Sequence, residues 1–162
     1  MKRSIVFLLA CVAFVTAAVA QAPTPPDKDV DQWVKEVREF KHAYLARELN
    51  LSREQQPKFF KVYDAMEDEI AGLNNETRRM SKRVKELPEG EVTDLEYDMA
   101  TDALFNLKAK EAKVELRYLP EFKEILDKKQ LFMLKDAERK FTMKMMRRHH
   151  DLRAARKGKA KN

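Results

Sequence analysis

Leu51-Ser52-Arg53-Glu54-Gln55 is the stretch that decides the fold, and Leu126-Asp127-Lys128-Lys129-Gln130 repeats its pattern 75 positions later. In each copy a leucine comes first, a helix-capping side chain second and a glutamine fifth. The serine or aspartate oxygen can accept a hydrogen bond from a free N–H of the first helical turn. The glutamine can reach back to the N–H of the capping residue, which completes a capping box. The sequence therefore predicts two helix starts of one kind.

The composition indicates helices throughout. Charged residues make up 37% of the chain, and it has only three glycines. Apolar residues recur at spacings of three and four, which predicts amphipathic helices with a narrow apolar stripe. We expect an all-α fold without strands, and we expect Pro120 to kink or break the third helix before a short turn over Glu121–Ile125. The predicted helices run over about 29–49, 52–87, 93–119 and 128–153.

The first 20 residues have the form of a signal peptide. Lys2 and Arg3 precede an apolar run, and Ala18-Val19-Ala20 forms a cleavage site. Cys11, the single cysteine, lies inside this leader. The exported chain is therefore expected to have no disulfide and no thiolate metal site.

The exported chain divides into a central helical domain and two ends. Residues 21–28 are a Pro-rich lead-in that we expect to be disordered. Residues 29–153 form the helical domain, and 154–162 are expected to be a basic disordered tail. From Lys144 to the end there are eight basic residues against one acidic residue. Such an end suits nucleic acid, anionic lipid or an acidic protein, or it simply keeps the chain soluble. Export and the lack of stacking aromatic residues among these cations argue against nucleic acid.

The leader, the helical chain and the two Leu-[Ser/Asp]-x-x-Gln starts resemble the Spy/CpxP family of periplasmic proteins, whose signature is a repeated Leu-Thr-x-x-Gln. The matching motif residues are Leu51, Ser52 and Gln55, then Leu126, Asp127 and Gln130. Neither copy keeps the threonine, although both keep a capping side chain. The resemblance covers roughly 36–150. It implies a periplasmic protein built as an elongated four-helix arrangement of two helical hairpins, in an antiparallel, cradle-shaped dimer.

The sequence gives no support to an enzyme. It has no Gly-rich phosphate loop, no His-Glu-x-x-His and no nucleophile elbow. Acidic runs such as Glu67-Asp68-Glu69 lie among Arg and Lys residues, where solvated pairs along a helix explain them. We therefore expect no catalytic residues.

A cluster near the end of the fourth helix is a candidate metal site. Met145 with His149 and Met146 with His150 are i,i+4 pairs, so each pair shares a helix face. Thioether and imidazole suit Cu(I) or a similar soft ion, and Zn is a second candidate. Some relatives of the resembled family sense or bind heavy metals. The alternative is that no metal binds, because the methionines form a pliable apolar surface, the histidines are exposed and nearby cations repel a metal ion.

The apolar stripes and the methionines suggest a function. Methionine surfaces accept varied apolar partners. We therefore expect a periplasmic, ATP-independent, chaperone-like holdase that binds unfolded envelope proteins in an envelope stress response. The alternative is a stress or heavy-metal sensor that binds a membrane signalling partner, and a helical spacer without clients is a third possibility. The expected partner surface consists of Phe59, Tyr63, Met66, Met80, Phe141, Met145, Arg147 and Arg148.

Overall fold

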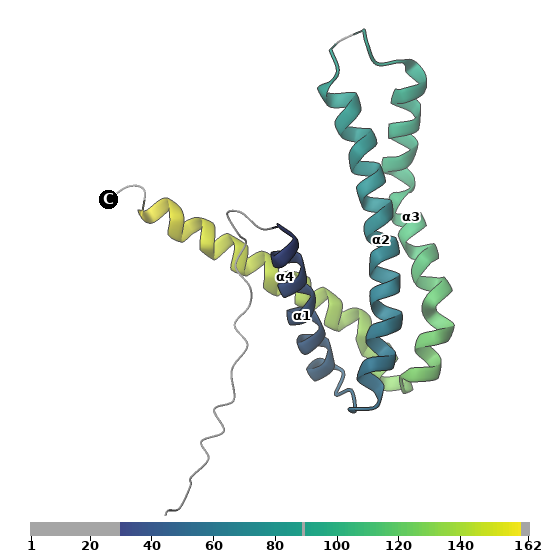
Figure 1. Ribbon diagram of the computed structural model, residues 1–162, viewed down its shortest axis with the longest axis vertical. Helices are drawn as coiled ribbons and strands as arrows, with labels where there is room; N and C mark the ends of the chain where they lie inside the picture. The colour runs from purple at the N-terminus through teal and green to yellow at the C-terminus, as the bar shows by residue number, and fades with distance from the viewer. Residues whose placement is uncertain (1–29, 89, 160–162) are drawn as a thin grey trace, which may run out of the picture. The chain divides into compact units, whose positions relative to one another are not determined.

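The chain is helical throughout the part that the structure describes. The computed structural model describes residues 30–88 and 90–159, and these residues include no strand (Figure 1). The all-α prediction is confirmed. The predicted leader over 1–20 and the Pro-rich lead-in over 21–28 lie outside the described residues. The helices are α1 (Val30–Glu48), α2 (Gln55–Glu86), α3 (Asp94–Ile125) and α4 (Lys128–Lys159).

The chain divides into two units, one that ends at Phe40 within α1 and one that begins at Lys41. In the first unit, Gln32 Nε2 donates a hydrogen bond to Glu36 Oε1 over 2.9 Å. This i,i+4 pair supports the first turns of α1. The second unit holds the end of α1 and the other three helices, and it contains every feature described below.

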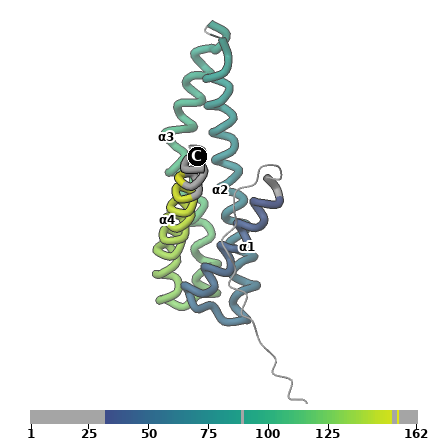
Figure 2. Tube along the Cα trace, turned by 90° about the vertical axis from the view of Figure 1, so that its left-hand side faces the viewer, coloured from purple at the N-terminus to yellow at the C-terminus, as the bar shows by residue number. Residues whose placement is uncertain are grey.

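Helices α2 and α3 form a long antiparallel hairpin, in which they lie side by side over most of their length (Figure 2). The stripe predicted for α2 faces inward, because Phe59, Tyr63 and Met66 are buried. At the bend Gly90 has φ +90°, a conformation that only glycine adopts without strain. Helix α2 ends at Glu86, one residue before the predicted end.

A capping box fixes the start of α3, close to the predicted helix start at 93. Thr93 Oγ1 accepts a hydrogen bond from the N–H of Glu96 over 3.3 Å. Glu96 Oε2 accepts from the N–H of Thr93 over 2.9 Å. Arg83, near the end of α2, donates from Nε to Glu96 Oε1 over 2.8 Å. The glutamate therefore joins the two helices across the bend.

This carboxylate gives the bend a pH dependence. Hydrogen bonds from the Thr93 backbone and from Arg83 lower the pKa of Glu96 from 4.5 to about 2. Because the folded pKa lies below the ordinary value, these bonds contribute fully above pH 4.5 and are lost as the pH falls toward 2. We expect an NMR titration of the Glu96 carboxyl carbon to have its midpoint near 2. The variant Glu96→Gln keeps the box without a titrating group, so its amide signals should stay constant in that window. A midpoint near 4.5 would contradict the bonded geometry.

Pro120 does not interrupt α3. The helix is continuous to Ile125, so the predicted break and the predicted turn over Glu121–Ile125 are wrong. A proline removes one helical hydrogen bond. Phe122, two residues later, is buried, and its ring centroid lies 5.6 Å from that of Phe59. The burial of this aromatic side chain offsets the lost bond and keeps the last turns helical.

Helix α4 is longer than the sequence suggests. It continues to Lys159, so residues 154–159, which we assigned to a disordered tail, are helical. Ala154 and Ala155 are strong helix formers and explain the extension. Residues 160–162 lie outside the described part. None of the described helices combines the length and the apolar character needed to cross a membrane.

The end of α1 is attached to α2 by polar contacts. Lys41 Nζ lies 2.5 Å from Glu67 Oε2, and His42 Nε2 lies 2.7 Å from Asp64 Oδ1. The His42 ring also stacks on Phe60, with the centroids 4.1 Å apart. These partners hold His42 half-buried between the end of α1 and α2.

Candidate functional site

Both predicted capping boxes of the repeated motif form. Ser52 Oγ accepts from the N–H of Gln55 over 3.2 Å, and Gln55 Oε1 accepts from the N–H of Ser52 over 3.0 Å. In the second copy, Asp127 Oδ1 accepts from the N–H of Gln130 over 2.7 Å, and Gln130 Oε1 accepts from the N–H of Asp127 over 3.0 Å. Regular α2 begins at Gln55, so Ser52 caps the turn just before it. The motif therefore does what its chemistry predicts at each helix start.

The two glutamines also bind each other across 75 positions of sequence. Gln55 Nε2 donates to Gln130 Oε1 over 2.8 Å, and Gln130 Nε2 donates to Gln55 Oε1 over 3.2 Å. Each amide also donates to a backbone carbonyl. Gln55 donates to the carbonyl of Ile125, and Gln130 donates to the carbonyl of Leu49. We call this reciprocal pair the glutamine clasp. It joins the turn between α1 and α2 to the turn between α3 and α4.

The 75-residue repeat extends beyond the motif into the core. Four pairs of residues that lie 75 positions apart are buried or half-buried in both copies. One corresponding pair is in direct contact, because Tyr63 donates from its hydroxyl to Glu138 Oε1 over 3.0 Å. The same spacing, carried past the motif in the sequence, would have pointed to these four pairs. The corresponding pairs are Leu51 with Leu126, Phe59 with Leu134, Tyr63 with Glu138 and Met66 with Phe141.

Half of the predicted partner surface lies in this core. Phe59, Tyr63, Met66 and Phe141 are 0%, 1%, 2% and 5% exposed. The Phe59 ring centroid lies 5.3 Å from that of Tyr63, and the Phe141 centroid lies 5.5 Å from that of Tyr44. These four side chains therefore do not form an exposed surface. They carry the regular apolar spacing because they face neighbouring helices, which is the usual role of such a stripe.

A network of charged groups borders the core. Lys135 Nζ lies 2.7 Å from Glu115 Oε1 and 3.0 Å from Glu138 Oε2. Burial alone would lower the pKa of Lys135, but its contacts with Glu115 and Glu138 raise it above the usual value. Burial, followed by the charge of Glu138, raises the pKa of the Tyr63 hydroxyl. The tyrosine therefore stays protonated as a donor, and the network links α2, α3 and α4.

The other predicted surface residues lie nearer to solvent. Met80, Met145 and Arg148 are half-buried, and Arg147 is exposed. They come from two different helices. The structure therefore brings together the buried half of the predicted set and leaves the rest dispersed.

Exposed apolar faces lie on α3 and on α4. The one on α3 and Phe132 of the one on α4 were missed by the sequence reasoning, whereas the α4 methionines were already expected at the surface. The α3 face consists of Phe105, Ala109, Ala112 and Leu116, whose spacing of four, three and four places them on one side of the helix. Phe105 is 85% exposed and Leu116 is 66% exposed. The α4 face consists of Phe132, Met143 and Met146, which are 83%, 53% and 67% exposed. Each face points away from the buried side of its helix. The signal in the sequence was a second set of apolar residues on each of these helices, on the side opposite the buried stripe.

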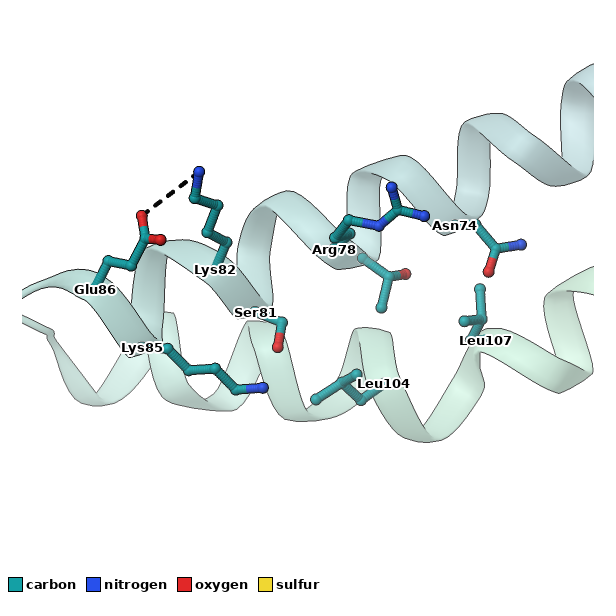
Figure 3. A pocket seen from close by; sticks show the side chains of 9 residues that line it. Asn74, Arg78, Ser81, Lys82, Lys85, Glu86, Leu104 and Leu107 are labelled. Carbon is teal, nitrogen blue, oxygen red and sulfur yellow. Dashed lines mark ion pairs between the residues drawn. The ribbon is translucent and has the colours of Figure 1, made fainter. Parts of the chain in front are cut away.

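A hollow of about 470 Å³ lies between α2 and α3 in the half of the hairpin nearer the bend (Figure 3). Leu104 and Leu107 from α3 give it an apolar lining. Across from them, α2 contributes Arg78 and Lys85, which make no ion pair with any residue that the structure describes. Small and polar residues of α2 such as Ser81 leave the space unfilled. The hollow is therefore cationic and favours an anionic group over a cationic one.

The predicted metal cluster lies on the distal half of α4. Met146, His149 and His150 are exposed, and Met145 is half-buried. Among the described residues, no three or more His, Cys, Asp or Glu side chains are placed to hold a metal ion. Methionine is not one of these four residue types, so this absence does not bear on the Met/His pairs. The pairing of Met145 with His149 and of Met146 with His150 as a Cu or Zn site stays a prediction.

Comparison of the chain with models of known families, with curated proteins and with solved structures gave no match.

Proposed function

We propose that this chain is a periplasmic, ATP-independent holdase that binds unfolded envelope proteins. The observation that carries the proposal is the α3 face. Phe105 and Leu116 are 85% and 66% exposed, and two alanines continue the apolar surface between them. Contiguous exposed apolar surface marks interaction sites in soluble proteins. An unfolded client would place its own apolar side chains against this stripe.

The charges beside the α3 face suit weak and general binding. Asp102, Lys108 and Lys113 are exposed on the same helix, so both signs of charge border the stripe. Charged borders keep the free protein soluble and attract clients at long range. These features favour varied, extended clients.

The proposal includes membership of the Spy/CpxP family, a role in an envelope stress response and an antiparallel, cradle-shaped dimer. What supports the family is the repeated motif, because Gln55 and Gln130 act together as one structural unit. The dimer is proposed from the resemblance to the family alone, because the α3 face is assigned to the client. Light scattering of the exported chain would give its mass in solution and so test the dimer directly.

An aggregation assay tests the holdase. The exported chain, mixed with a chemically unfolded client at equimolar ratio without ATP and with EDTA, is expected to suppress light scattering. The double variant Phe105→Ser/Leu116→Ser should need about tenfold more protein for the same effect, because each substitution removes apolar contact with the client. The matched control is Phe132→Ser, an equally exposed phenylalanine on α4, which should act like the parent.

Two results would contradict the holdase. One is a parent protein without effect on any unfolded client, and the other is a double variant that suppresses scattering as well as the parent. Suppression that needs added Cu or Zn, together with saturable binding to one folded partner, would favour the sensor function. In that case Met145, Met146, His149 and His150 would be the residues to replace next.

A further inference from the structure

Helix α4 has an unusual distribution of charge. Lys128–Lys159 contains twelve lysines and arginines against three acidic residues. One side of this helix is held in the core, because Leu134, Ala137 and Phe141 are 5%, 3% and 5% exposed. The opposite side is therefore fixed outward by the packing of the fold.

The outward side of α4 carries the α4 face. Phe132 and Met143 are eleven residues apart, close to three full turns, and Met146 follows three residues later. All three side chains are more than half exposed. The side therefore presents three apolar groups over about four helical turns, with the exposed Arg139 between Phe132 and Met143.

Exposed basic side chains lie among these apolar groups and beside them. The exposed ones are Lys128, Lys129, Arg139, Lys140 and Arg147. The acidic residue Asp136 pairs with two of them within the helix. Its carboxylate oxygens lie 2.7 Å from Arg139 Nη2 and 2.7 Å from Lys140 Nζ. Asp136 therefore offsets one of these five positive charges, and the outer side stays net positive.

Exposed apolar groups among cations fit an anionic bilayer surface. A basic amphipathic helix lies in the interface plane, with its apolar groups at the acyl boundary and its cations among the headgroups. Each lysine or arginine near such a surface adds attraction to anionic lipid. A nucleic acid would use the cations, but it would leave the exposed methionines without a partner.

We propose that the outer side of α4 binds the surface of an anionic phospholipid bilayer, with Phe132, Met143 and Met146 toward the acyl chains. This inference does not rest on the holdase function, which uses the α3 face. The helix lies on the bilayer and does not cross it.

Vesicle co-sedimentation tests the proposal. The protein is purified after export, and mass spectrometry verifies that Met1–Ala20 is absent, because an apolar leader would itself bind lipid. We expect binding to vesicles of phosphatidylcholine with 30% phosphatidylglycerol (roughly the anionic surface that attracts basic helices) and no binding to pure phosphatidylcholine. The double variant Phe132→Ser/Met146→Ser should bind about tenfold or more weakly, because it removes the groups that enter the acyl boundary.

The matched control is Phe105→Ser/Leu116→Ser, which alters the α3 face and should bind vesicles like the parent. The two double variants therefore separate the two functions, since one should lose client protection and the other vesicle binding. Equal binding to neutral and anionic vesicles would overturn the proposal. The proposal would also be overturned if the α4 variant bound vesicles like the parent and the parent bound a DNA duplex as tightly at the same salt. That result would indicate a general site for polyanions.

Discussion

Replacement of Phe59 by alanine is expected to lower the free energy of unfolding by about 3–5 kcal/mol. The Phe59 side chain is 0% exposed. Its ring centroid lies 5.1 Å from that of Phe60, 5.3 Å from that of Tyr63 and 5.6 Å from that of Phe122. Truncation removes these contacts and leaves a cavity between α2 and α3 that the surrounding side chains fill only in part. Urea denaturation followed by circular dichroism measures the change.

Phe132→Ala is the matched control for this measurement. The same side-chain atoms are removed at a position that is 83% exposed, so the change should stay within about 0.5 kcal/mol. Should Phe59→Ala instead leave stability intact and abolish client binding, Phe59 would be the surface residue that the sequence first suggested. The buried arrangement would then be wrong.

The glutamine clasp leads to the second large effect. Gln55→Ala and Gln130→Ala should each lower the free energy of unfolding by about 2–4 kcal/mol. Each substitution removes several hydrogen bonds, worth about 1 kcal/mol apiece, and leaves a former partner without a hydrogen bond. Gln55 binds the Ser52 N–H, the Ile125 carbonyl and the Gln130 amide. Either substitution removes one capping box, breaks the clasp and leaves the other amide partly unpaired.

A double-mutant cycle separates the clasp from the local caps. Because both substitutions remove the same two amide–amide bonds, Gln55→Ala/Gln130→Ala should cost about 1–2 kcal/mol less than the sum of the single changes. Gln56→Ala is the control, since the Gln56 side chain donates to the Leu51 carbonyl alone, and it should cost about 1 kcal/mol. Additive effects would mean that the two glutamines act as independent caps.

Local features of the chain were predictable from the sequence. The capping boxes at Ser52, Thr93 and Asp127 involve residues three positions apart, so their geometry depends on one helical turn. The α2 stripe follows in the same way from helical periodicity. Four helices could be placed from these signals.

Interactions between distant residues could not be predicted in the same way. The contact of Gln55 with Gln130 depends on how two turns meet in space, although each glutamine was already identified as a cap. Periodicity shows that a stripe is apolar, but not whether a neighbouring helix covers it. For this reason Phe59 was expected at the surface while Phe105 was missed. The contact of His42 with Asp64 likewise depends on how α1 lies against α2.

The glutamine clasp also sets an order of events in biosynthesis. Gln55 leaves the ribosome 75 residues before Gln130, which at 5–20 residues per second is a delay of roughly 4–15 s. During this interval the start of α2 has its local cap, but its amide has no distant partner. The emerging chain therefore cannot complete its central contact until the first turn of α4 has been synthesised. A ribosome stalled before that turn would hold a nascent chain that is helical but not yet closed.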